Sequence, residues 1–433
     1  MISEKIVSPF QKFVKIESFS GILLMAATIV ALVWANSPLS ESYQSIWQYK
    51  VGFTTQHFEL YKPLILWIND GLMAVFFFLI GLEIKREFLI GELNSIKKIA
   101  FPLFGALGGM LVPVFVFFLL NQNPETLKGW GIPMATDIAF SLAVLKLLGD
   151  KVPLSLKIFL TAFAIVDDLG AVLVIALFYS GNIKFGLLIT AIVLLSILYV
   201  ISYKGNYSKF IMISFGIVIW TLFLKAGIHP TLAGVLLAFS VPIRQKIKTP
   251  EFVDNLVTIT NNIKKASILK KPILSKEQIN EIDNLEDWTN KYQSPLQHLE
   301  HNLHDWVAYF IIPIFALANA GVIISNDMVL DFGLVLNIII CLFIGKSIGI
   351  SSIIFLAKKT KIIEVPLDIS SRQIIGVSFL AGIGFTMAIF IASLAFIDDA
   401  IYLDSAKIGI LIGSLLSAII GYFILSVTTT KKA

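Results

Sequence analysis

Long apolar runs separated by short polar connections make up most of the chain. A helix needs about 20 predominantly apolar residues to cross a bilayer, and most of these runs approach that length. The seventh and eighth runs are short and would be tilted or only partly spanning. The pattern predicts an all-α membrane protein with twelve transmembrane segments, at residues 14–35, 64–84, 99–120, 130–147, 154–179, 183–202, 209–224, 227–241, 303–321, 333–357, 373–397 and 406–427.

Composition agrees with this pattern. Hydrophobic residues make up 57% of the chain and charged residues 15%, whereas about 25% of a soluble domain is charged. The apolar run from Phe19 to Trp34 is longer than a signal-peptide core and lacks the small-residue cleavage site, so it is expected to remain as the first helix. The single cysteine, Cys341, excludes an intrachain disulfide. Residues 1–433 are interpreted as one integral membrane domain.

Basic residues are distributed unequally between the two sides of the predicted bundle. When both termini are placed on one side, that side holds 27 of the 34 Lys and Arg residues and the other side six, with Lys346 inside a segment. Cytoplasmic loops are enriched in Lys and Arg. Both termini and the long charged loop at residues 244–302 are therefore predicted to be cytoplasmic. The net charge of +5 follows from this rule and does not indicate nucleic-acid binding.

Four charged residues lie within apolar segments: Asp137, Asp167, Asp168 and Lys346. One charged side chain at membrane depth costs roughly 3 kcal/mol on insertion scales. The four together therefore cost on the order of 10 kcal/mol, as much as the whole stability of an ordinary domain. An inert aspartate pair facing a water-filled cleft is the alternative interpretation. Four charged residues that are this costly to insert favour a membrane-embedded site for cations or protons.

Two predicted segments are interrupted by helix-breaking residues. Gly131 and Pro133 precede Asp137 in the fourth segment, and Gly382 and Gly384 lie in the eleventh. Proline and paired glycines weaken the helical hydrogen-bond ladder, which a membrane tolerates only inside protein or beside water. Either interruption alone is equally compatible with a simple kink. Their matching positions in two halves of the chain favour a transporter with inverted repeats.

Two polar connections contain patterns of regular structure. A β-hairpin and a surface loop are both compatible with the outer stretch from Ser45 to Tyr61, which is rich in aromatic residues and threonine. In the inner loop, Ser275 and Gln278 form a capping box that predicts the start of an amphipathic helix. The apolar stripe of this helix, expected to rest on the inner membrane surface or on the bundle, comprises Ile279, Ile282, Leu285 and Trp288.

Titratable residues gather at two places near the predicted inner surface. Their spacing puts Glu83, Arg86 and Glu87 on one helical face, an arrangement that also suits an interfacial anchor with ordinary ion pairs. The second group is compatible with three structures: a transition-metal site, a pH sensor or a solvated helix end. No thiolate is present to support the metal site. This second group contains three of the five histidines, His298, His301 and His304.

Several long strings, spread over most of the chain in a fixed order, resemble the NhaA family of sodium/proton antiporters. The strings are Ile68–Phe77, Gly81–Glu87, Pro133–Phe140, Ala164–Gly170, Gly227–Gly234, Gly345–Gly349 and Gly382–Met387. This family is a known example of inverted repeats with broken helices. The inner loop before Glu300 is longer here than in the best-known members, and Pro230 stands where small residues also occur.

The resemblance implies a twelve-helix fold in which the fourth and eleventh helices unwind and cross at mid-membrane. It implies that Asp168 and Asp167 carry cation and proton binding, with sodium or lithium as the bound metal ion. Asp137, with Thr136 beside it, would lie at the crossing, where positive half-helix ends need a negative partner. Lys346 would meet the negative ends and pair with Asp167.

The resemblance also implies regulation, assembly and location. Residues near a cytoplasmic funnel would sense pH, with His229 associated with the pH response on the outer side. Exchange would be electrogenic and require no cofactor, in a multi-pass protein of the bacterial inner membrane. The outer stretch resembles the dimer contact of the family, so a homodimer is expected. The funnel residues implied are Glu83, Arg86, Glu87, Glu300, His301 and His304.

Two other classes of membrane protein place charges within the bilayer. An intramembrane aspartyl protease buries two carboxylates but needs a Gly-x-Gly-Asp string, whereas Asp137 follows Ala-Thr and Asp168 follows Asp167. A cation channel needs a continuous pore, typically formed by a ring of repeated subunits. The sequence therefore predicts a transporter and not an enzyme.

Overall fold

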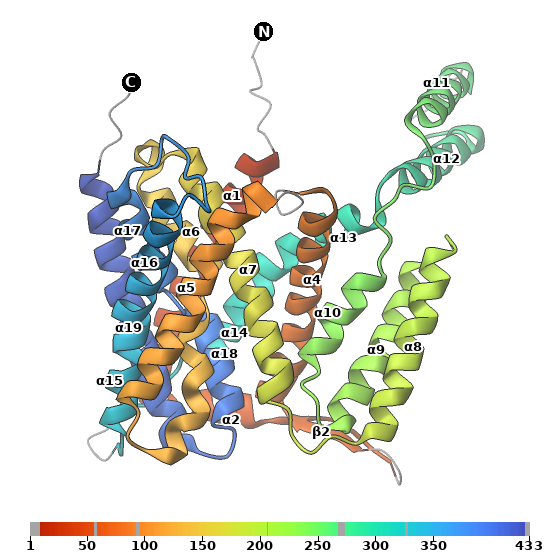
Figure 1. Ribbon diagram of the computed structural model, residues 1–433. Coiled ribbons are helices and arrows are strands. Elements are labelled where there is room, and N and C mark those ends of the chain that lie inside the picture. Colours follow the sequence, from red (N-terminus) through yellow and green to blue (C-terminus); the bar gives the residue numbers. More distant parts are fainter. Residues whose placement is uncertain are drawn as a thin grey trace.

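A computed structural model describes residues 9–55, 59–91, 96–205, 207–266, 273–324 and 328–428. These residues form a bundle of helices (Figure 1). The predicted cytoplasmic arm before residue 9, part of the inner loop and the C-terminal tail lie outside the described residues.

Long helices form most of the bundle. They are α1 (Pro9–Ala35), α4 (Met73–Ile90), α5 (Ile96–Leu120), α7 (Leu154–Phe178), α8 (Phe185–Tyr203), α9 (Lys209–Ala226) and α19 (Ala400–Val427). Shorter helices complete it: α2 (Ser40–Gln48), α3 (Leu64–Leu66), α6 (Ile138–Leu147), α10 (Thr231–Ser240), α13 (Pro295–Trp306), α14 (Ile312–Asn319), α15 (Phe332–Ile340), α16 (Lys346–Lys359), α17 (Ser371–Ala381) and α18 (Phe385–Ala395). Two stretches are 3-10 helices, η3 (Pro124–Met134) and η4 (Gly149–Lys151).

The described residues contain seven helical stretches that are long and apolar enough to cross a membrane. The number reaches ten when three bent helix pairs each count as one span: α1 with α2, η3 with α6, and α17 with α18. Each of the twelve predicted apolar segments overlaps helical structure. Some, such as α10 with ten residues, are too short to cross alone. The protein is thus a helical, multi-pass membrane protein.

Three of the described helical stretches contain a turn of π-helix. η1 (Trp67–Leu72) leads into α4, η5 (Val307–Ile311) joins α13 to α14, and η6 (Cys341–Gly345) joins α15 to α16. Such turns are rare and occur frequently at functional sites, because one extra residue changes the direction of the side chains that follow. Lys346 is the first residue after η6.

The outer stretch forms a β-hairpin, which decides between the two structures that the sequence left open. β1 (Lys50–Thr54) pairs with β2 (Glu59–Pro63) in antiparallel register, with Gly52 opposite Tyr61. Gly52 has φ of 144°, and a Cβ atom there would lie 1.8 Å from the carbonyl oxygen of Leu60. Only glycine fits this backbone without strain.

The inner loop contains a pair of helices that projects beyond the bundle (Figure 1). α12 (Lys276–Tyr292) begins at the predicted capping box of Ser275 and Gln278. It packs on α11 (Thr249–Ala266), a helix that we did not predict, through stacked rings of Phe252 and Tyr292 at 4.2 Å. Contact of the apolar stripe with the membrane surface or the bundle stays a prediction. Leu285 and Trp288 are half-buried, whereas the other two residues of the stripe, Ile279 and Ile282, are exposed.

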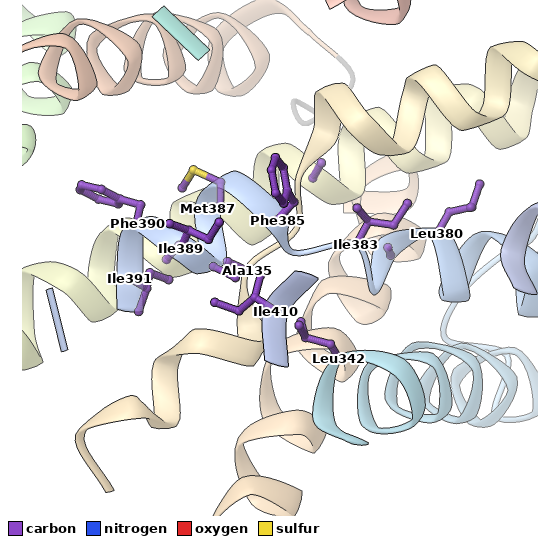
Figure 2. Close-up of a cluster of buried hydrophobic side chains, with 14 of the residues drawn as sticks. Ala135, Leu342, Leu380, Ile383, Phe385, Met387, Ile389, Phe390, Ile391 and Ile410 are labelled. Atoms are coloured by element: carbon purple, nitrogen blue, oxygen red, sulfur yellow. The ribbon is translucent and has the colours of Figure 1, made fainter. Parts of the chain in front are cut away.

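Apolar side chains enclose the gap between α17 and α18 (Figure 2). Ile383 in this gap is fully buried, as are Leu342 of η6, Leu380 of α17 and Ile410 of α19. Ala135, in the gap between η3 and α6, belongs to the same cluster. The two interrupted helices therefore share one largely apolar core, in which buried backbone polar groups need hydrogen-bond partners.

Candidate functional site

The first interruption places Asp137 at the start of a helix. η3 ends at Met134 and α6 begins at Ile138, so three residues with non-helical backbone lie between them. Asp137 is the N-cap of α6, with φ of −92° and ψ of 101°, and its Oδ1 accepts a hydrogen bond from the N–H of Phe140. Pro133 lies just before the interruption, as predicted for a residue that cannot continue a helical ladder.

The second interruption depends on two glycines. α17 ends at Ala381 and α18 begins at Phe385. A Cβ atom on Gly382 would lie 2.5 Å from the carbonyl oxygen of Leu342, and one on Gly384 would lie 3.1 Å from that of Ala135. Glycine is therefore needed for close approach of neighbouring backbones, not for a left-handed conformation.

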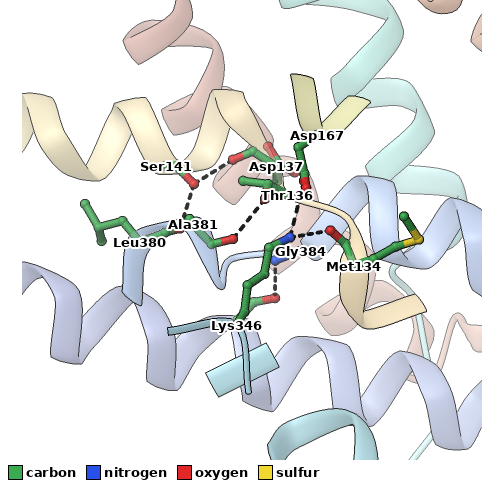
Figure 3. A network of polar contacts seen from close by, with 10 residues as sticks. Met134, Thr136, Asp137, Ser141, Asp167, Lys346, Leu380, Ala381 and Gly384 are labelled. Carbon is green, nitrogen blue, oxygen red and sulfur yellow. Dashed lines mark hydrogen bonds and ion pairs between the residues drawn. The ribbon is translucent and has the colours of Figure 1, made fainter. Parts of the chain in front are cut away.

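The two interruptions contact each other directly (Figure 3). The N–H of Asp137 donates to the carbonyl oxygen of Ile383 at 2.7 Å. The hydroxyl of Thr136 donates to the carbonyl oxygen of Ala381 at 3.0 Å, and that of Ser141 donates to Leu380 O at 2.9 Å. Side chains near the first interruption thereby satisfy carbonyl groups that the end of α17 leaves without helical donors.

The carboxylate of Asp137 caps two helices. Besides the bond from Phe140, its Oδ2 accepts hydrogen bonds from the backbone N–H, at 3.0 Å, and from the hydroxyl of Thr386 in the first turn of α18. Helix N-termini carry partial positive charge, which a carboxylate compensates. One buried aspartate thus compensates the N-termini of both α6 and α18.

Lys346 compensates charge of the opposite sign. Its side chain is fully buried, and its ammonium group donates to the carbonyl oxygen of Met134, the last residue of η3. The same ammonium lies 3.3 Å from Oδ2 of Asp167 on α7. The structure therefore brings Lys346 to a negative helix end and to Asp167, as the resemblance implied.

Asp168 lines a cavity, whereas its neighbour Asp167 does not. Both aspartates are buried, with 1% of Asp167 and 2% of Asp168 exposed. Asp168 lines a cavity together with Thr136, Asp137 and Glu83, whereas Asp167 does not belong to the lining. Consecutive residues of a helix point about 100° apart, which separates the two carboxylates. The rest of the lining is mainly apolar and comes from α4, η5, α14, α6 and α18.

A group of charged side chains lies beside this cavity, around Glu83. Arg86 forms ion pairs with Glu87 at 2.9 Å and with Glu300 of α13 at 3.0 Å. Glu83 lies 4.0 Å from Nδ1 of His304 and also lines the cavity. Burial raises the pKa of Glu300, and the Arg86 guanidinium opposes part of that rise. Five of the predicted pH-sensing residues are thus brought together, and one of them reaches the cavity.

The two remaining predicted pH-sensing residues, His229 and His301, do not line the cavity. His301 is exposed on α13. His229 precedes α10, and its Nε2 contacts the carbonyl oxygen of Tyr179 just after α7. Tyr179 also accepts from the N–H of Gly131, linking His229 to the start of the first interruption. Within the described ranges, no three His, Cys, Asp or Glu side chains converge to hold a metal ion, so the histidines of α13 form no such site there.

Two hydroxyl residues of the site were not predicted. Thr386 contacts Asp137, 249 positions away in the sequence, and Ser141 donates to Leu380 across 239 positions. The available signal was weak: each is a hydroxyl residue within an apolar run, one turn or less from a helix interruption. Hydroxyl residues of membrane helices often bond their own backbone, as Ser378 does here and as Ser141 also does through the carbonyl oxygen of Asp137.

Comparison with known proteins gives the family. The family model described as Na+/H+ antiporter 1 matches residues 11–425. The Na(+)/H(+) antiporter NhaA of Oleidesulfovibrio alaskensis is 47% identical over 427 residues, which cover 98% of this chain and 95% of that protein. Proteins of the same name from Wolinella succinogenes and Helicobacter pylori are 44% and 45% identical, over 97% and 95% of this chain and 93% of each relative. The chain belongs to the NhaA family of sodium/proton antiporters.

Proposed function

We propose that the protein exports sodium or lithium ions in exchange for protons across the bacterial inner membrane. As a member of an antiporter family, it is a transporter and not an enzyme. One observation carries the proposal: Asp168 lines a cavity with Asp137 and Glu83, while Asp167 pairs with buried Lys346. A cation can reach one carboxylate of the pair, and an internal cation already compensates the other.

Competition for Asp168 is the proposed exchange mechanism. A sodium ion and a proton neutralise the same negative charge, so binding of one excludes the other. Deprotonated Asp168 accepts sodium from the inner side, and its protonation on the outer side releases the ion. Unwound backbone carbonyls are suitable sodium ligands in broken-helix transporters, and the hydroxyl oxygen of Thr136 is a further candidate.

The other buried charges are proposed to compensate the partial charges of the helix ends around the site. Asp137 compensates the two positive helix ends, and Lys346 compensates a negative one. Asp167 is proposed to couple a further proton to the cycle through Lys346. More protons than sodium ions would then move per cycle, so exchange would be electrogenic. One net charge moved across ~100 mV contributes ~2.3 kcal/mol.

Regulation by pH is proposed to arise at the inner end of the cavity. Ion pairs and close contacts connect Glu83, Arg86, Glu87, Glu300 and His304, so the response is proposed to belong to the group and not to a single residue. His229 lies apart from this group and would contribute separately, whereas exposed His301 interacts electrostatically with His304. Activity is expected to rise with pH over roughly one or two units around neutrality.

We further propose twelve spans, a crossing of the interrupted fourth and eleventh spans, and cytoplasmic termini. The described start of α1 and end of α19 lie on the face from which α11 and α12 project, which supports this orientation (Figure 1). Residues 244–302 would form a cytoplasmic part of one membrane domain covering 1–433. Every residue of β1 is exposed, and an exposed strand edge can pair with another chain, which supports a homodimer.

Exchange in liposomes tests the function. Purified protein is reconstituted into liposomes with a pH-sensitive dye, and sodium, lithium or potassium is added to acid-loaded liposomes. Wild-type protein is expected to release protons on addition of sodium, and Asp168→Asn protein is expected to release none. Asp287→Asn makes the same chemical change on exposed α12 and should behave as wild type. Wild-type exchange by the Asp168→Asn variant would refute the proposal.

A further inference from the structure

The N-terminus of α18 is buried inside the bundle. The first N–H groups of any helix have no carbonyl partner within that helix. At membrane depth each such group needs a partner from the protein or beside a cavity, and neither Gly384 nor Phe385 lines the cavity of Asp168. Asp137 supplies two acceptor contacts to α18, and both go to Thr386. The N–H groups of Gly384 and Phe385, which come first, need another acceptor.

Ser414 of α19 supplies that acceptor. Its hydroxyl oxygen accepts hydrogen bonds from the N–H groups of Gly384 and Phe385, each at 3.2 Å. The side chain is buried, with 4% exposed. Its position is possible because α19 packs against both α17 and α18. A third helix therefore takes part in holding the interruption.

Capping of α18 is thus divided between two side chains. Ser414 binds the first two N–H groups, and Asp137 binds the third together with the Thr386 hydroxyl. We propose that Ser414 is a positioning residue for the ion site. It holds the first turn of α18 where Thr386 reaches Asp137, and it thereby fixes the Asp137 carboxylate beside the cavity that also contains Asp168. This inference rests on the proposed function of that cavity.

Ser417 provides a matched control on the same helix. It lies one turn after Ser414, is fully buried, and stands at the other edge of the interruption, where a Cβ atom on Gly382 would lie 2.8 Å from its hydroxyl oxygen. Among the described residues, that oxygen has no hydrogen-bond partner. Replacement of either serine by alanine removes the same atom from the same helix, but only Ser414→Ala removes hydrogen bonds to α18.

The test compares sodium dependence of exchange in liposomes at one alkaline pH. Removal of the Ser414 hydroxyl is expected to raise the apparent KM for sodium roughly tenfold, the effect of one to two net hydrogen bonds, and to change the maximal rate less than about twofold. Ser417→Ala should retain the wild-type KM. Equal KM values for Ser414→Ala and wild type, or equal rises in both alanine variants, would overturn the assignment.

Ser414→Cys keeps the proposal testable if the alanine variant does not fold. A thiol is nearly isosteric with a hydroxyl, and its sulfur is only a weak acceptor. This variant is expected to raise KM several-fold, and a wild-type KM would contradict the role of the two hydrogen bonds. Failure of the proposed function is recognised separately, because the wild-type protein would then show no sodium-dependent proton release at all.

Discussion

The ammonium group of Lys346 lies 3.3 Å from a carboxylate oxygen of Asp167, and 0% and 1% of the two side chains are exposed. The pair joins α16, which follows a π-helical turn, to α7, which also carries Asp168. Both side chains are buried, so the charge of each is compensated mainly by the charge of the other. Removal of one partner should therefore destabilise the protein more than removal of both partners together.

Replacement of Lys346 by glutamine should destabilise the protein strongly. Removal of one partner leaves a buried charge uncompensated, which typically costs about 3–5 kcal/mol. Replacement of both partners, in Lys346→Gln with Asp167→Asn, should recover most of that loss. Reversible unfolding in detergent measures it, with exposed Lys359→Gln at the end of the same helix as control. Additive losses in the double variant would show that the two groups do not interact.

Asp137 should contribute more to stability than an aspartate that caps one helix. Asp137→Ala removes the caps of both α6 and α18, so we expect a loss of about 2 kcal/mol or more in unfolding free energy. Asp331→Ala removes the cap of one helix, α15, in which the N–H of Leu334 donates to Oδ1 of Asp331, and should cost about 1 kcal/mol. The same unfolding assay compares them. A smaller loss for Asp137→Ala than for Asp331→Ala would argue against double capping.

Glu300 should make folding less favourable as pH rises. Burial raises the pKa of its carboxyl group above the ordinary value of 4.5, although Arg86 opposes part of the rise. A raised pKa means that the folded state holds the proton more tightly. The stabilisation is therefore present at acidic pH and is lost as pH rises through the raised pKa. Glu300→Gln should flatten the unfolding free energy between pH 4.5 and neutrality, measured against exposed Glu286→Gln.

The same substitution should move the pH dependence of exchange. Glutamine resembles the protonated carboxyl group, which we associate with the less active state at low pH. Glu300→Gln is therefore expected to shift the activity profile to higher pH, by up to about one unit for one member of a coupled group. Its apparent KM for sodium at high pH should change little. An unshifted profile would assign a purely structural role to the Arg86–Glu300 pair.

Orientation in the membrane can be measured by cysteine labelling. Cys341 is the only cysteine and is buried, so Cys341→Ser gives a clean background. Exposed Asn280 of α12 and exposed Thr54 of β1 are then replaced singly by cysteine. An impermeant maleimide should label Thr54→Cys in intact cells and Asn280→Cys only after permeabilisation. The reverse result would place the termini and the inner loop outside.

Much of the site could be predicted because charge is so costly in a membrane. Asp137, Asp167, Asp168 and Lys346 were identifiable from their apolar surroundings alone. The capping box at Ser275 was equally readable, since it depends on residues three positions apart.

Other parts depend on packing between distant segments. The bonds from Thr386 to Asp137 and from α18 to Ser414 join residues far apart in sequence, and no local spacing indicates them. The π-helical turn before Lys346 is also invisible in an apolar run whose residues favour a regular helix equally well. Helix α11 was missed because its apolar residues are separated by polar Asn and Thr, which form part of its contact with α12.

The pH dependence of the apparent KM for sodium tests most directly whether sodium and protons compete for Asp168. Proton release from liposomes gives this KM at each of a series of pH values below the optimum. Sodium concentrations at each pH range from limiting to saturating. Competition by one proton predicts that KM falls about tenfold for each unit of rising pH while the maximal rate stays constant. A constant KM with a maximal rate that changes with pH would contradict competition at one site.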